Sequence, residues 1–117
     1  YAPDPYCDDL SLVLESAKGL VVVCGCCHAG LLNTLEHVQR LFASPIVAIA
    51  GGTHLLNADA DTLEHIARTL HGWGTLHGIY LNHCSGEKAY HILRQVMGDD
   101  IVHLCPAGTI LEMEVGL

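Results

Sequence analysis

Three apolar segments of this chain each end at a histidine close to glycine, and no other feature restricts the fold as strongly. The segments run from Leu20 to His28 (LVVVCGCCH), from Ile46 to His54 (IVAIAGGTH) and from Leu76 to His83 (LHGIYLNH). Short apolar runs bounded by glycine are typical of buried strands. Because the strands of an open α/β sheet deliver functional side chains at their carboxyl edge, three imidazoles in these positions can share one metal ion.

The spacing of apolar residues along the chain predicts an α/β fold with one mixed sheet. Residues 10–16 alternate polar and apolar side chains and are expected to form a hairpin with 20–25, a strand buried on both faces. Helical spacing begins at Gly30, resumes after a cap at Asp59 or Asp61, and begins again at Ser85-Gly86-Glu87. The predicted strands are 10–16, 20–25, 46–50, 76–81, 101–104 and 109–115, and the helices end before Pro45, at Gly72 and Gly74, and at Gly98.

The order of these elements also predicts an uneven sheet. Right-handed crossovers place consecutive helices on the same side of a sheet unless the strand order reverses. If all three helices cover one face, the other face is apolar and bare. Such a face requires a second layer, which either a second copy of the chain or a missing portion of it would supply.

Composition limits the class of partner. The 117 residues fit one domain, and half of them are apolar, yet no apolar run reaches the about eighteen residues of a membrane span. The net charge of −8, with only five Lys and Arg, argues against nucleic acid as a partner. Four of the six cysteines lie in or beside strand-like segments, which favours reduced thiols and a cytoplasmic location. The chain begins at Tyr1 rather than at a methionine, so we expect Tyr1 to be a boundary within a longer sequence.

The segment Gly25-Cys26-Cys27-His28-Ala29-Gly30 holds the densest group of reactive side chains. Its glycines permit a tight turn from strand to helix, and the helix that follows directs free backbone N–H groups toward that turn. Metal ligation, anion binding and a lowered thiol pKa are all consistent with this arrangement. A buried structural turn with inert thiols is equally consistent with it.

The segments around His83 and His54 repeat parts of this arrangement. A helix is predicted to begin directly after His83, and His54 follows Gly51-Gly52, a pair that lets backbone approach a ligand or another strand closely. The remaining histidines do not stand on a glycine turn at the end of a strand, and we interpret them as surface or core residues: His37, His65, His71, His77, His91 and His103. Cys24 and Cys105 are interpreted as small core residues.

Taken in order, these segments resemble the C-terminal half of metallo-β-lactamase-fold hydrolases. The matching segments are Asp8-Asp9 before LSLVLES, then GLVVVCGCCHAG, VAIAGGTHLL, LNHCSGEKA and AGTILEMEV. They are most similar to the branch described as dihydropteroate-synthase-like, whose usual motifs are GCSHAG, GGFHL and CHCTGEKA. In this chain Cys27 replaces the usual Ser, Thr53 the usual Phe, Asn82 the usual Cys or Pro, and Ser85 the usual Thr.

The resemblance implies one half of an αββα sandwich whose complete form holds a di-metal centre, usually zinc, for metal-assisted hydrolysis. It implies that His83 is a metal ligand and that His54 points into the same site. It also implies that Cys26 or His28 stands where other members place a bridging carboxylate. The principal metal motif of the superfamily, His-x-His-x-Asp-His, belongs to the N-terminal half and does not occur in this sequence. We therefore expect the chain alone to be a poor hydrolase.

Three functions follow from these observations. The first is a metal-dependent hydrolase that needs a missing N-terminal half and acts on a small anionic substrate. Its divalent metal would be zinc, with iron and manganese as alternatives, and its ligands would be His28, His54, His83 and Cys26. Its anion-binding residues would be Gly30, Ser85 and Gly86. The second is a non-catalytic metal-binding or assembly module that forms a homodimer through its bare sheet face. The third is thiol chemistry at Cys26 and Cys27.

Overall fold

The computed structural model describes residues 11–25, 30–52, 55, 58–82 and 86–104, and these form five strands and three helices. Strands β1 (Ser11–Ser16) and β2 (Gly19–Cys24) form the first pair, and each later strand follows a helix. The other elements are α1 (Leu31–Leu41), β3 (Ile46–Gly51), α2 (Ala60–Trp73), β4 (Gly78–Leu81), α3 (Glu87–Met97) and β5 (Val102–Leu104). The predicted α/β class with one mixed sheet is confirmed.

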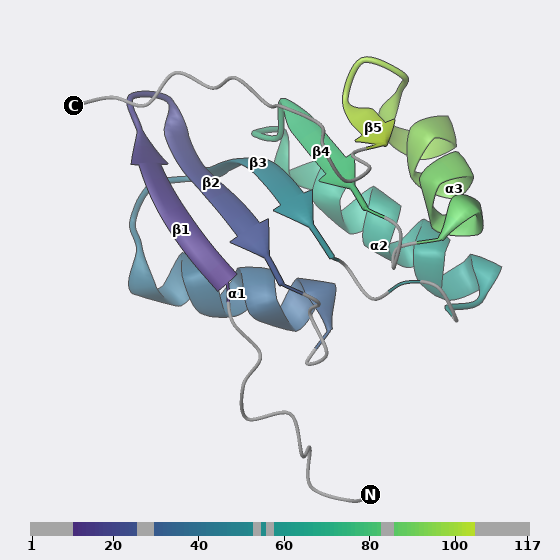
Figure 1. The fold of residues 1–117 in the computed structure, drawn as a ribbon, viewed down its shortest axis with the longest axis horizontal. Coiled ribbons are helices and arrows are strands. Elements are labelled where there is room, and N and C mark those ends of the chain that lie inside the picture. Colours follow the sequence, from purple (N-terminus) through teal and green to yellow (C-terminus); the bar gives the residue numbers. More distant parts are fainter. Residues whose placement is uncertain (1–10, 26–29, 53–54, 56–57, 83–85, 105–117) are drawn as a thin grey trace, which may run out of the picture.

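The five strands lie in the sheet in the order of the sequence, β1-β2-β3-β4-β5 (Figure 1). The first pair is an antiparallel hairpin, and β2 to β5 run parallel to one another. The Ser16 hydroxyl closes the hairpin turn, since it accepts from the N–H groups of Lys18 and Gly19 and donates to the Gly19 carbonyl. Because the strand order never reverses, every right-handed crossover falls on the same side of the sheet.

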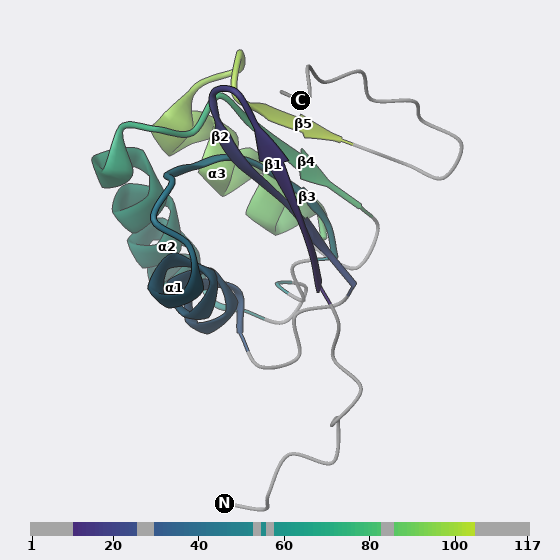
Figure 2. The same cartoon turned by 90° about the vertical axis from the view of Figure 1, so that its left-hand side faces the viewer.

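All three helices accordingly lie on one face of the sheet, as Figure 2 shows. Each helix turns an apolar stripe toward the strands because its apolar residues recur at every third or fourth position. The buried members of these stripes are Leu31, Leu35 and Val38 in α1, Leu63, Ile66, Ala67 and Leu70 in α2, and Ala89, Leu93 and Met97 in α3. They form one core with strand residues such as Leu20, Ile49 and Ile79. None of the described helices has the length and apolar character needed to cross a membrane.

The opposite face, here called the open face, has no described helix over it (Figure 2). By strand register it carries Leu12, Leu14, Val21, Val23, Val47, Ala48, Ala50, Gly78, Tyr80 and His103. Val21, Val47 and Ala48 form a small buried cluster, whereas Leu12 and Leu14 on the edge strand are 64% and 42% exposed. The structure thus contains the apolar second face that the sequence predicts.

Several predicted boundaries differ from the structure by one or two residues. Strand β4 begins at Gly78 rather than at residue 76, because the buried Leu76 packs into the core before the strand starts. Helix α2 continues through Gly72, which is exposed and tolerated near a helix end, and stops at Gly74 in the left-handed conformation, with φ at 69°. The strand predicted at 109–115 lies outside the described residues.

Candidate functional site

Three parallel strands end level with one another at the carboxyl edge of the sheet. Cys24 at the end of β2 pairs with Gly51 at the end of β3, and Gly51 pairs in turn with Leu81 at the end of β4. Figure 1 shows the three arrowheads pointing the same way. The segments that leave these strands, 25–30, 52–59 and 82–86, therefore start side by side. These are the segments in which the sequence places His28, His54 and His83.

The predicted ligands themselves, His28, His54, His83 and Cys26, lie outside the described residues, as does Ser85. Within the described part of the chain, no group of three or more His, Cys, Asp or Glu residues is arranged to hold a metal ion. The structure therefore gives the strand ends, Cys24, Gly51 and Leu81, after which the segments with the predicted ligands begin. The chemistry of the predicted donor set, three imidazoles and a thiolate, fits zinc.

Two of the predicted anion-binding residues, Gly30 and Gly86, are described, and both stand at the N-cap of a helix. Gly30 precedes α1 with φ at 98°, and Gly86 precedes α3 with φ at 84°. Among the described residues, no side chain accepts a hydrogen bond at either cap. The first backbone N–H groups of a helix have no acceptor within the helix, so both helix ends can donate to an anion at this edge.

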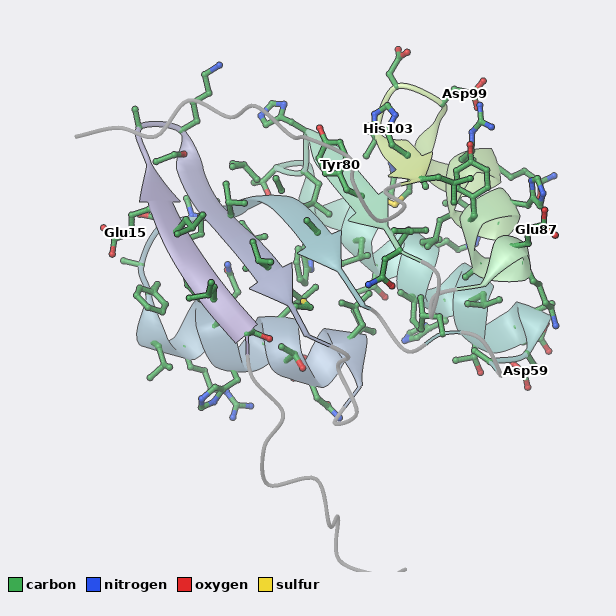
Figure 3. All side chains as sticks on the ribbon, in the orientation of Figure 1. Glu15, Asp59, Tyr80, Glu87, Asp99 and His103 are labelled. Carbon is green, nitrogen blue, oxygen red and sulfur yellow. The ribbon has the colours of Figure 1, made fainter. Side chains whose placement is uncertain are left out.

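Helix α2 begins differently, because it is capped by its own carboxylate. The backbone N–H of Thr62 donates to Oδ1 of Asp59 at 2.8 Å. Hydrogen bonds from the side chain and then the backbone of Thr62 lower the pKa of Asp59, and the positive charge of Lys88 lowers it further. Figure 3 shows Asp59 and Glu87 at the first turns of α2 and α3. Of the three helices, α2 alone therefore carries a fixed negative charge at its N-cap.

The histidines interpreted as surface or core residues agree with that interpretation. His37, His65 and His91 are exposed on helices, and His71 is exposed in the last turn of α2. His77 is exposed just before β4, and His103 is half-buried in β5. Cys24 is buried in the helix-side core, as predicted, whereas Cys105 lies outside the described residues.

The structure also shows an aromatic pair that the sequence did not reveal. Tyr80 and His103 stack across β4 and β5 with ring centroids 5.2 Å apart and planes 18° apart (Figure 3). Nε2 of His103 lies 3.0 Å from the carbonyl oxygen of Asp100, which fixes the ring at the edge strand. Only the strand register brings these two residues together, since 23 positions separate them in the sequence.

Two grooves in the described part of the chain lie in the helix layer, one of about 790 Å³ between α2 and α3 and one of about 410 Å³ between α1 and α2. The first includes Arg68, His71 and Ile92, and the second includes Leu32 and Trp73. Neither groove is lined by a predicted site residue. The segments that carry the predicted residues start instead at the carboxyl edge of the sheet.

Comparison with known proteins gives relatives that are longer than this chain. No protein-family model matches it. It is 28% identical over 106 residues to the 7,8-dihydropterin-6-methyl-4-(β-D-ribofuranosyl)-aminobenzene-5′-phosphate synthase of Methanocaldococcus jannaschii, a match to 90% of this chain and 35% of the synthase. It is 33% identical over 92 residues to a protein of the same organism described as uncharacterized, a match to 76% of this chain and 32% of that protein.

Comparison with solved structures tests the predicted fold. The crystal structure of a metal-dependent hydrolase of the β-lactamase superfamily superimposes with a TM-score of 0.77 and 31% identity, over 89% of this chain and 40% of the hydrolase. The predicted resemblance to metallo-β-lactamase-fold hydrolases is confirmed. The chain spans about a third of the length of the curated relatives it matches.

Proposed function

We propose that this chain, which has the fold of one part of a metallo-β-lactamase-superfamily hydrolase, contributes one sheet and part of a divalent-metal site to such an enzyme. The observation that carries the proposal is the alignment of Cys24, Gly51 and Leu81 at one edge. Three segments with a histidine each leave the sheet from these points. The structural neighbour is a metal-dependent hydrolase, which supports the same chemistry.

In this proposal His28, His54 and His83 hold the metal together with Cys26, and zinc suits these imidazole and thiolate donors. When bound, a divalent metal supplies Lewis acidity and lowers the pKa of water, which is the chemistry of metal-assisted hydrolysis. A catalytic site needs further ligands and a bound substrate. We propose that the N-terminal half of a longer protein supplies these further ligands, since the chain spans about a third of the length of its curated relatives.

The N-termini of α1 and α3 are proposed to hold an anionic group of the substrate. No described side chain caps the helix at Gly30 or at Gly86, and Ser85 precedes Gly86 in the sequence. A helix N-terminus binds phosphate well because its N–H groups and its dipole both favour negative charge. The name of the synthase relative specifies a 5′-phosphate, which supports a small phosphate-bearing substrate.

The open face supports the second proposed function, an assembly module. The face spans five strands about 4.8 Å apart and about five residues along each strand, or roughly 400 Å² in plane. A standard interface buries about 800 Å² on each partner, so two copies packed face to face would form a small interface. The missing half of the sandwich is the alternative cover for this face. The cysteine pattern supports a cytoplasmic location for either form.

The test is the metal content of the purified chain after equilibration with zinc and removal of excess metal. We expect bound zinc in the wild-type chain and its loss in both His28→Ala and His83→Ala. His37→Ala is the matched control, because His37 is an exposed helix residue away from the carboxyl edge, and this variant should retain zinc. A folded wild-type chain that retains no zinc would contradict the metal site. Equal zinc retention in all three variants would exclude His28 and His83 as ligands.

A further inference from the structure

Gly51 lies between the ends of the other two central strands at the carboxyl edge. On one side it pairs with Cys24 of β2, and the next residue, Gly52, donates its backbone N–H to the Cys24 carbonyl at 3.2 Å. On the other side the backbone N–H of Asn82 donates to the Gly51 carbonyl at 3.3 Å. The ends of β2, β3 and β4 are thus joined through the backbone of this one glycine and its neighbour.

Two independent features exclude a side chain at this position. The backbone of Gly51 has φ at 108°, a conformation that L-residues rarely adopt. A Cβ atom there would overlap the carbonyl oxygen of Cys24 and lie 3.2 Å from the Cys24 backbone nitrogen. These atoms belong to the backbone of a paired strand, so they cannot rotate away. Any larger residue must separate the end of β3 from the end of β2.

We infer that Gly51 is a positioning residue that sets the spacing of the three segments carrying His28, His54 and His83. This inference rests on the proposed metal site. The three segments start at Gly25, Gly52 and Asn82. These residues lie at or next to the two backbone hydrogen bonds that join the strand ends. A shift of the β3 end relative to β2 changes the distance between two of the three starting points. Ligand geometry tolerates only small displacements, so metal affinity should respond before the fold does.

The chain provides two matched control glycines for the test. Gly98 has nearly the same φ, 103°, but its Cβ position has no atom within 4 Å. Gly19 has the same kind of overlap at the amino edge, where a Cβ would lie 2.5 Å from the Pro45 carbonyl oxygen. Gly98→Ala therefore introduces only the backbone strain, and Gly19→Ala separates β2 from β3 at the edge away from the predicted site.

The experiment measures Co²⁺ affinity by visible absorption for the wild-type chain and for Gly51→Ala, Gly19→Ala and Gly98→Ala, with the melting temperature of each. We expect Gly51→Ala to lose about 10- to 100-fold in Co²⁺ affinity, the range seen when the support of metal ligands is removed. Gly19→Ala and Gly98→Ala should stay within about threefold of wild type, although their melting temperatures fall as well. Equal losses of affinity in Gly51→Ala and Gly19→Ala would overturn the inference, because affinity would then follow stability alone.

Amide hydrogen exchange separates this inference from the proposed function. If the wild-type chain binds no Co²⁺, the proposed metal site fails, and exchange alone decides the role of Gly51. We expect faster exchange at Gly52 and Asn82 in Gly51→Ala and unchanged exchange at both in Gly19→Ala. If Gly51→Ala does not fold, hydrogen exchange of the wild-type chain tests the inference instead. The Gly52 and Asn82 amides should then exchange with the same free energy of opening. Independent opening of these two amides, or unchanged exchange in Gly51→Ala, would contradict the inference.

Discussion

The two faces of the sheet are made of the same strands but are completed in different ways. The helix-covered face belongs to a core in which Leu20, Leu35 and Ile49 are at most 1% exposed. The open face has a small cluster around Val21 and leaves Leu12 64% exposed. Helices from this chain complete the first face. The second face remains as apolar strand surface without a described helix (Figure 2).

This difference shows where the information for the fold is held. A strand residue on the helix-covered face packs against helix residues of the same chain. Those helix residues recur three to four positions apart along each helix. Within the described ranges, a strand residue on the open face packs only against its neighbours in the sheet. Substitutions on the first face should therefore change the stability of the chain, and substitutions on the second should change what the chain associates with.

The largest effect is expected at Leu35, which lies at 0% exposure in the middle of α1. Leu35→Ala removes buried methyl groups and leaves a cavity, which should lower the free energy of unfolding by about 2–5 kcal/mol. Leu12→Ala on the open face is the matched control and should cost less than about 1 kcal/mol. Urea denaturation of both variants measures the difference. Similar losses in the two variants would show that the open face is packed as firmly as the other.

The second effect concerns association through the open face. Leu12→Lys combined with Leu14→Lys places two charges on the exposed edge of that face. We expect the wild-type chain to self-associate weakly with rising concentration and the double variant to sediment as a monomer, because a desolvated charge opposes apolar packing. Ser11→Lys adds the same kind of charge on the same strand but on the other face, so it should leave association unchanged. A wild-type chain that stays monomeric at all concentrations would contradict the homodimer.

Most of the fold was predictable because the local signals agree with the final packing. Helical spacing gave α1, α2 and α3, and Pro45, Gly74 and Gly98 mark or follow their ends. The strand order and the shift of register between Leu20 and Val21 were not predictable, because pairing depends on which strands meet in space. The sequence predicts the start of β4 two residues too early. Leu76 is apolar because it packs into the core from the loop before the strand.

The candidate site was predictable only in part, for a related reason. Histidines after apolar runs indicated a shared edge, and the register of Cys24, Gly51 and Leu81 provides that edge. The double glycine indicated a close backbone approach, but the sequence did not show that Cys24 is the strand residue approached. The stack of Tyr80 on His103 had no sequence signal, because cross-strand neighbours follow from register alone.

A smaller effect on stability is expected at the N-cap of α2, one of the helices that cover the sheet. Because hydrogen bonds from Thr62 lower the pKa of Asp59, the cap stabilises the fold above the ordinary aspartate pKa. This stabilisation is lost as the pH falls below about 4 through the lower pKa of the folded state. Asp59→Ala should therefore lower the melting temperature at pH 7, and the difference from wild type should shrink in acid. Asp61→Asn removes a nearby charge of the first turn without removing the cap, so it should retain the acid-dependent loss seen in wild type.

The smallest change in stability is expected at Gly78, on the open face. A Cβ there would lie 2.7 Å from Cε2 of Tyr80 and 2.8 Å from its hydroxyl oxygen. These atoms form the far end of a rotatable side chain, so Gly78→Ala should move the Tyr80 ring and leave the backbone in place. Alanine stabilises a strand by about 0.5–1 kcal/mol relative to glycine, and loss of the ring stack costs a similar amount, so the net change should be within about 1 kcal/mol.

The informative measurement for Gly78→Ala is the chemical shift of the His103 ring protons, which the stacked Tyr80 ring displaces. We expect these shifts to move toward unstacked values in Gly78→Ala and to stay unchanged in Gly72→Ala, where a Cβ meets no atom within 4 Å. Unchanged His103 shifts in Gly78→Ala would mean that the ring pair is held as rigidly as the core. A moved ring with preserved stability would show that side chains on the open face rearrange at little cost, because no described residue forms a second layer that fixes them.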